Sequence, residues 1–139
     1  MATWDDVQRL ALALPETSED RGTWRVRSKG FVWERPLRKR DLDELGPAAP
    51  SGPILGVRLS DVSEKEALIA SNPSVYFTTS HFDGYPAILV QLDHIDEAEL
   101  AEVITDAWLA QAPKRLAKQY LAGLGGRDRL DGPGGLDSR

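Results

Sequence analysis

The stretch that decides the fold runs from Asn72 to Tyr120 and reads NPSVYFTTSHFDGYPAILVQLDHIDEAELAEVITDAWLAQAPKRLAKQY. Two apolar runs flank an Asp83-Gly84 turn at 75–79 and 87–92, which is the pattern of a β-hairpin. A helix capped by Asp96 follows, and one stripe of it carries Leu100, Val103, Ile104, Ala107 and Trp108. Because such a stripe is buried in a folded protein, we expect this helix to pack on the hairpin.

The N-terminal third predicts one helix and one further hairpin. Thr3 is in the position of an N-cap, and the helix that follows ends at Pro15. Glu16–Gly22 is polar and turn-like. From Thr23 the apolar residues alternate, which predicts a strand to Arg27 and, after a short turn, a second strand over Phe31–Arg35.

The middle and the end of the chain are less regular. Leu37–Gly52 is rich in charge, proline and glycine, and it predicts a long exposed loop. A strand is expected at Ile54–Leu59, and a short helix is expected to open with a capping box formed by Ser63 and Glu66. After Pro113 a helical segment runs to about residue 124, and residues 125–139 have the composition of a flexible tail.

This order of elements predicts an α+β fold in two layers. The sequence of elements is α-β(3)-α-β(2)-α, followed by a C-terminal helical extension. Short connections favour a mostly antiparallel five-stranded sheet with helices covering one face. A single domain is expected over residues 1–124, with the tail at 125–139.

Composition narrows the classes of function. The 139 residues include no cysteine, so thiolate catalysis, disulfides and cysteine metal sites are excluded. No apolar run is long enough to cross a bilayer and the N-terminus lacks a signal-peptide pattern, so we expect a cytoplasmic protein with no membrane contact. His81 and His94 lack metal-ligand spacing, and no nucleophile or phosphate-loop motif is present. We therefore predict no enzyme activity, no catalytic residue, no metal and no cofactor.

Charge is distributed unevenly along a chain whose formal net charge is −5. Residues 21–40 hold eight basic side chains and one acid, whereas residues 73–112 hold seven acids and no lysine or arginine. Basic side chains on a hairpin suit phosphate contacts, and those of the last helix extend the patch if that helix lies beside the hairpin. The residues predicted to contact nucleic acid are Arg25, Arg27, Arg38, Lys39, Arg40, Lys114, Arg115 and Lys118.

A structural interpretation competes with each of these functional ones. The arginines of the first hairpin equally suit a solvated face above a core of Trp24 and Val26. The acids of the long helix suit its outer face, although carboxylates are also ligands for hard cations. The turn between the last two strands offers a separate contact surface through His81, Phe82 and Tyr85.

Several short stretches together resemble the MmcQ/YjbR family of small bacterial proteins. They are Ala13-Leu14-Pro15-Glu16, Asn72-Pro73 with Tyr76-Phe77-Thr78-Thr79, His81, Gly84-Tyr85-Pro86, Leu89-Val90 with Leu92, Asp106-Ala107-Trp108, and Ala112-Pro113-Lys114-Arg115-Leu116. The resemblance implies the α-β(3)-α-β(2)-α order and a fold similar to secretion-chaperone-like domains. It also implies a "double wing" mode of DNA binding, and it brings no catalytic residues.

Two functions remain open from the sequence. One is a double-wing module that binds double-stranded DNA with its two hairpins as wings. The other is a chaperone-like module that binds a protein or a small ligand with the face or edge of its sheet. We expect a monomer or a weak homodimer in either case.

Overall fold

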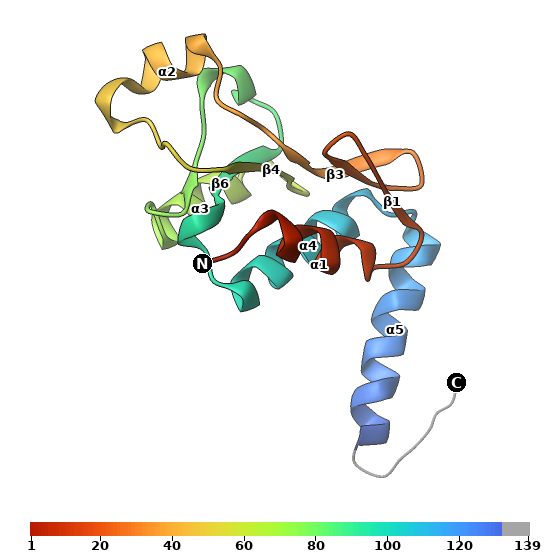
Figure 1. Cartoon of the computed structure of the whole chain (residues 1–139). Coiled ribbons are helices and arrows are strands. Elements are labelled where there is room, and N and C mark those ends of the chain that lie inside the picture. The colour runs from red at the N-terminus through yellow and green to blue at the C-terminus, as the bar shows by residue number, and fades with distance from the viewer. Residues whose placement is uncertain (132–139) are drawn as a thin grey trace.

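A six-stranded antiparallel sheet organises the computed structural model, which describes the backbone of residues 1–131 and the side-chain surroundings of residues 1–123 (Figure 1). The strand order across the sheet is β1-β2-β3-β4-β6-β5. The strands are β1 (Thr17–Asp20), β2 (Thr23–Val26), β3 (Lys29–Glu34), β4 (Ile54–Arg58), β5 (Tyr76–Phe77) and β6 (Ala87–Gln91). The helices are α1 (Trp4–Leu12), α2 (Lys39–Leu45), α3 (Glu64–Ser71), α4 (Glu97–Gln111) and α5 (Lys114–Asp131).

The predicted α+β class and antiparallel sheet are confirmed, but the expected five strands are six. The additional strand is β1, which lies in the segment expected to be a turn and pairs with β2 from Thr17 opposite Val26 to Asp20 opposite Thr23. Arg21 and Gly22 make the connection with φ values of 52° and 81°, the positive φ pair that tight hairpin turns require. As an exposed edge strand, β1 has no need of the apolar alternation by which strands are recognised.

The expected loop at 37–52 is also wrong in part, because it contains α2 and a 3₁₀ turn at Gly46–Ala48. Asp41 explains how so polar a segment folds. Its carboxylate accepts the backbone N–H of Arg38 at 2.9 Å and pairs with Arg35 at 3.1 Å in a buried position. Glu44 of α2 also accepts hydrogen bonds from the Ser80 backbone and hydroxyl. Because these polar contacts hold the helix, its sequence shows no apolar stripe.

One face of the sheet carries the main core, as the sequence predicted. α1 and α4 lie together on this face (Figure 1), and the whole predicted stripe of α4 is buried. Trp24 and Val26 of β2 also point into this core, which confirms the structural interpretation of that strand. Asp96 caps α4 as expected by accepting the N–H of Glu99 at 2.7 Å.

The other face of the sheet carries a second, smaller apolar cluster. Its buried members are Ile54, Phe82, Ala87 and Leu89, with Trp33, Leu37 and Phe77 packed against them. α2 lies on this side of the sheet, opposite α1 and α4 (Figure 1). The central strands β4 and β6 are therefore buried on both faces, which accounts for their unbroken apolar sequences.

Two helix ends differ from expectation. Ser63 does not form the predicted capping box with Glu66. It is the N-cap of α3, but its backbone angles are already helical and its side chain makes no cap hydrogen bond. The Glu64 carboxylate instead accepts the N–H of Ser60 at 3.1 Å. At the other end of the chain, α5 continues past Leu124 to Asp131, and residues 132–139 of the predicted tail lie outside the described residues.

Gly56 on β4 gives a first testable prediction. A Cβ atom at this position would overlap the Trp33 indole on the neighbouring strand. We expect Gly56→Ala to lower the free energy of unfolding by about 1–3 kcal/mol, the usual cost of overpacking. Urea denaturation measures this loss, and Gly123→Ala is the matched control variant. A Cβ at Gly123 meets no atom within 4 Å, and alanine is a better helix former than glycine. Equal stabilities of the two variants would contradict the packing of Trp33 on Gly56.

Candidate functional site

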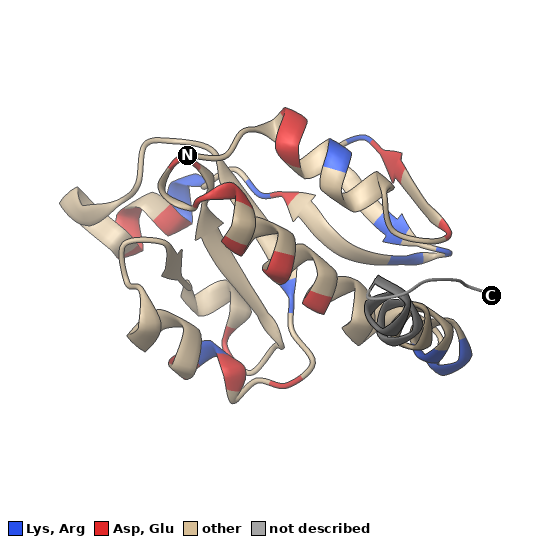
Figure 2. Ribbon diagram, turned by 90° about the horizontal axis from the view of Figure 1, so that it is seen from below, with Lys and Arg blue, Asp and Glu red and all other residues tan. Residues whose placement is uncertain are grey.

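Two groups of predicted basic residues meet at one end of the molecule. Gln111 at the end of α4 donates a hydrogen bond from Nε2 to the Gly30 carbonyl oxygen of β3 at 3.0 Å. Lys114 follows only three residues later, and α5 is held here by buried Leu116 and by contact of Tyr120 with Trp108. We call this region the basic end; it comprises the predicted residues Arg25, Arg27, Lys114, Arg115 and Lys118, together with Lys29, which was not predicted. Figure 2 shows blue segments of the hairpin and of α5 at the same end of the molecule.

Acids on and beside β1 neutralise part of the basic end. Arg27 pairs with Glu16 at 2.6 Å, and this hydrogen bond lowers the pKa of the Glu16 carboxyl. Arg25 lies 3.7 Å from Asp20. The other four residues of the basic end form no ion pair with any described side chain, and all four are exposed. They are Lys29, Lys114, Arg115 and Lys118.

The remaining predicted basic residues lie elsewhere. Arg38, Lys39 and Arg40 stand at the start of α2, at the far end of β3 from the β2–β3 turn (Figure 1). The length of β3 alone, roughly 17 Å at 3.4 Å per step, separates the two groups. Lys39 is also paired with Asp43 at 3.3 Å. Arg25 and Arg27 therefore lie at one end of β3, and Arg38, Lys39 and Arg40 lie at the other.

The predicted contact turn between β5 and β6 is only partly a surface. Phe82 is 5% exposed and belongs to the second apolar cluster, because the connection folds back over that face of the sheet. Its assignment as an exposed contact residue is therefore wrong. His81 is exposed, and its ring packs edge-on against the Phe82 ring with 4.8 Å between the ring centroids. Tyr85 is 44% exposed, and its hydroxyl accepts a hydrogen bond from Arg58 at 3.1 Å.

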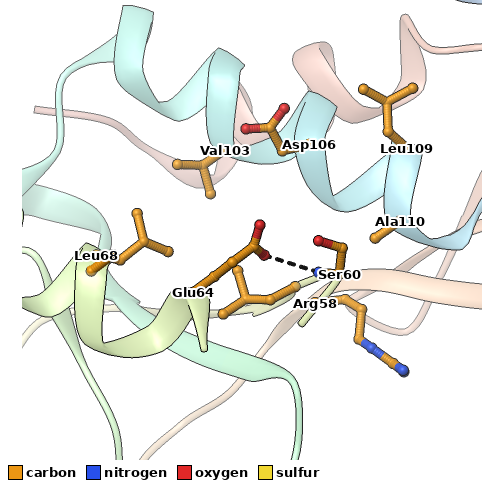
Figure 3. A pocket seen from close by; sticks show the side chains of 10 residues that line it. Arg58, Ser60, Glu64, Leu68, Val103, Asp106, Leu109 and Ala110 are labelled. Carbon is orange, nitrogen blue, oxygen red and sulfur yellow. Dashed lines mark hydrogen bonds between the residues drawn. The ribbon is translucent and has the colours of Figure 1, made fainter. Parts of the chain in front are cut away.

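A groove between α3 and α4 was not expected from the sequence. A hollow of about 520 Å³ lies between Glu64, Ala67 and Leu68 of α3 and the second half of α4 (Figure 3). A second hollow of about 370 Å³ continues it toward the start of α4, sharing three lining residues with the first. Those shared residues are Leu68, Val103 and Asp106. We call the two hollows together the α3/α4 groove.

Carboxylates gather along this groove. Burial raises the pKa of Asp106, and the negative charges of Glu64 and Glu102 raise it further. Tyr76 at the bottom of the second hollow donates a hydrogen bond to Glu99, and its own pKa is raised by burial and by this carboxylate. The acids were recognised in the sequence as one helix face, but nothing there indicated that α3 faces them across a hollow.

The described part of the chain contains neither a metal-binding cluster nor a helix that could span a membrane. Within residues 1–123, no group of three or more histidine, aspartate or glutamate side chains is arranged to hold a metal ion. None of the described helices combines the length and the apolar character needed to span a bilayer. His94 contacts the Ser74 carbonyl oxygen through Nδ1 at 2.9 Å, and its Nε2 lies 3.7 Å from the Asp93 carboxylate.

Comparisons with known proteins place the chain among relatives without an established function. It is 56% identical to uncharacterised proteins of Mycobacterium bovis and Mycobacterium tuberculosis over 129 residues, which are 90% of this chain and all of theirs. Its fold is similar to the crystal structure of a Deinococcus radiodurans protein with a DUF419 domain, with a TM-score of 0.57, 18% identity and 78% of each chain covered. The YjbR family model matches residues 12–110, nearly the whole span from the end of α1 to the end of α4. The chain therefore belongs to the YjbR family.

Proposed function

We propose that this protein is a non-catalytic module that contacts the phosphate backbone of double-stranded DNA through its basic end. The observation that carries the proposal is the Gln111–Gly30 hydrogen bond, which brings the first turns of α5 beside the β2–β3 hairpin. Lysine and arginine residues of two separate elements then lie at the same end of the molecule (Figure 2), and all of them except half-buried Arg25 are exposed. Such a surface suits phosphate contacts, which position a protein on DNA without reading its sequence.

The charge balance limits this contact to a modest, salt-sensitive one. Four cations of the basic end are unpaired among the described side chains, and the molecule as a whole is acidic. Each neutralised phosphate contributes roughly −0.9 to the slope of log K against log salt concentration. About four contacts give a slope near −4, and with it a loss of affinity of more than tenfold between 50 and 150 mM salt.

Fluorescence anisotropy with a labelled 20-base-pair duplex tests the proposal. We expect saturable binding at 50 mM NaCl that weakens steeply as salt is added. Replacing Lys114, Arg115 and Lys118 together with alanine is expected to weaken binding at least tenfold at the lower salt concentration. Leu116 and Tyr120, which hold α5 against the core, stay in place in this variant.

A matched control uses the second basic group of the chain. Replacing Arg38, Lys39 and Arg40 with alanine also removes three positive charges, but at the opposite end of β3. Binding by this control is expected to fall much less than binding by the α5 variant. Absence of binding at 50 mM NaCl, or equal losses in the two variants, would contradict a contact at the basic end.

A further inference from the structure

The α3/α4 groove has an apolar floor that no other described segment covers. Leu68 of α3 and Val103 and Leu109 of α4 line it, and Ala67 and Ala110 leave it wide because their side chains are short (Figure 3). Its larger hollow, at about 520 Å³, has the volume of an ordinary small-molecule site, for which 300–1,000 Å³ is typical. The size and the apolar lining therefore suit a small organic ligand.

The polar lining of the groove is almost entirely anionic. Five carboxylates border its two hollows, and Glu64 and Asp106 face each other across the larger one (Figure 3). These five acids are Glu64, Asp96, Glu99, Glu102 and Asp106. Arg58 is the one basic residue in the described lining, and its guanidinium is turned out of the hollow onto Tyr85, 5.0 Å from the ring centroid.

The carboxylates lack cationic partners within the described residues. Glu102 and Asp106 accept no hydrogen bond and form no ion pair with any described side chain, whereas Glu64 accepts only the backbone N–H of Ser60. The raised pKa of Asp106 reflects the cost of holding negative charge beside Glu64 and Glu102 in a partly buried place. A cation in the groove removes that repulsion.

We propose that the α3/α4 groove binds a small organic cation, a primary ammonium group carried on an apolar chain or ring. The ammonium lies between Glu64 and Asp106, and the apolar body lies along Leu68, Val103 and Leu109. A bare metal ion fits less well, since these acids are not arranged as metal ligands in the part of the chain that the structure describes. The apolar floor also has no use in metal binding.

Titration of ¹⁵N-labelled protein with hexylammonium, followed by amide NMR spectra at 150 mM NaCl, tests this proposal. We expect saturable shifts confined to amides of α3 and the second half of α4, with half-saturation at millimolar or lower concentration. Hexanol has the same apolar chain without the charge, and we expect it to bind at least tenfold more weakly. Equal affinity for hexanol, shifts located elsewhere, or no saturation would overturn the proposal.

Variants separate this site from general attraction to an acidic protein. Asp106→Asn is expected to weaken hexylammonium binding about tenfold, because a neutral amide loses the charge-assisted contact. Glu66→Gln is the matched control: Glu66 is exposed on α3 but does not line the groove, and its loss is expected to leave affinity unchanged. Ala67→Phe places a ring in the hollow and is expected to abolish binding. Equal weakening by the Asp106 and Glu66 variants would show nonspecific attraction and overturn the site.

Discussion

Replacing Trp108 with alanine is expected to lower the free energy of unfolding by about 4 kcal/mol, in the range for a buried aromatic side chain. Trp108 is the largest fully buried side chain of the described core. Its indole Nε1 donates to the Pro15 carbonyl oxygen at 3.0 Å, and its ring lies 5.1 Å from that of Tyr120 between centroids. One side chain of α4 thus joins the connection between α1 and β1 to the first turns of α5.

Urea denaturation followed by circular dichroism measures this loss, and Trp108→Phe is the informative control. Phenylalanine keeps most of the apolar volume but removes the N–H donor, which leaves the Pro15 carbonyl oxygen without this partner. We expect the phenylalanine variant to lose about 1–2 kcal/mol, most of it from the missing hydrogen bond and the smaller ring. A loss below 1 kcal/mol in the alanine variant would refute the central place of Trp108 in the core.

The second large effect is expected at the ion pair between Arg35 and Asp41, which is buried beneath α2. Arg35 Nη2 lies 3.1 Å from the Asp41 carboxylate, and its guanidinium also covers the Phe82 ring at 5.4 Å. Asp41→Ala leaves the arginine charge buried without its partner and is expected to cost about 3–5 kcal/mol. The double variant Arg35→Met, Asp41→Leu removes both charges and is expected to recover most of that loss.

The pH dependence of the Asp41→Ala loss provides an independent check. Burial would raise the pKa of Asp41, but the Arg38 N–H and the Arg35 guanidinium outweigh it and hold the pKa below the ordinary 3.8. Since the folded pKa is depressed, the contribution of Asp41 is fully present above 3.8 and is lost as the pH falls through the folded value. The stability gap between wild type and Asp41→Ala should therefore be full at pH 7 and shrink below pH 4. A gap that stays constant down to pH 2 would contradict an ionised Asp41.

The elements predicted correctly from the sequence are those whose buried residues give a periodic apolar pattern. The α4 stripe, the cap at Asp96 and the pairing of β5 with β6 were all expected and are present. β1 and α2 were missed because they lie at an edge and on a flank, where neither strand alternation nor a helical stripe is needed. β1 is joined to β2 by the Arg21-Gly22 turn, and α2 is held by the Arg35–Asp41 pair and by the Glu44–Ser80 hydrogen bonds. Neither strand alternation nor a helical stripe indicates contacts of this kind.

The same distinction applies to the candidate sites. All residues of the basic end except Lys29 were predicted from the sequence to contact DNA. Which of the predicted residues share one end of the molecule follows only from the fold, in which Gln111 at the end of α4 is hydrogen-bonded to Gly30 of β3. The α3/α4 groove was not predicted, because its two walls are about forty residues apart along the chain and each alone is an ordinary helix face. A run of charge identifies residues, whereas the path of the backbone decides which of those residues share a surface.

The contact of Trp108 with Pro15 also has a consequence for how the chain is made. The two residues are 93 positions apart, and α1 buries its apolar face against α4. At 5–20 residues per second, a ribosome completes that interval in roughly 5–20 seconds. During this time α1 has no α4 to pack against, while β1, β2 and β3 can already pair with one another. α1 is thus synthesised well before the helix that buries its apolar face.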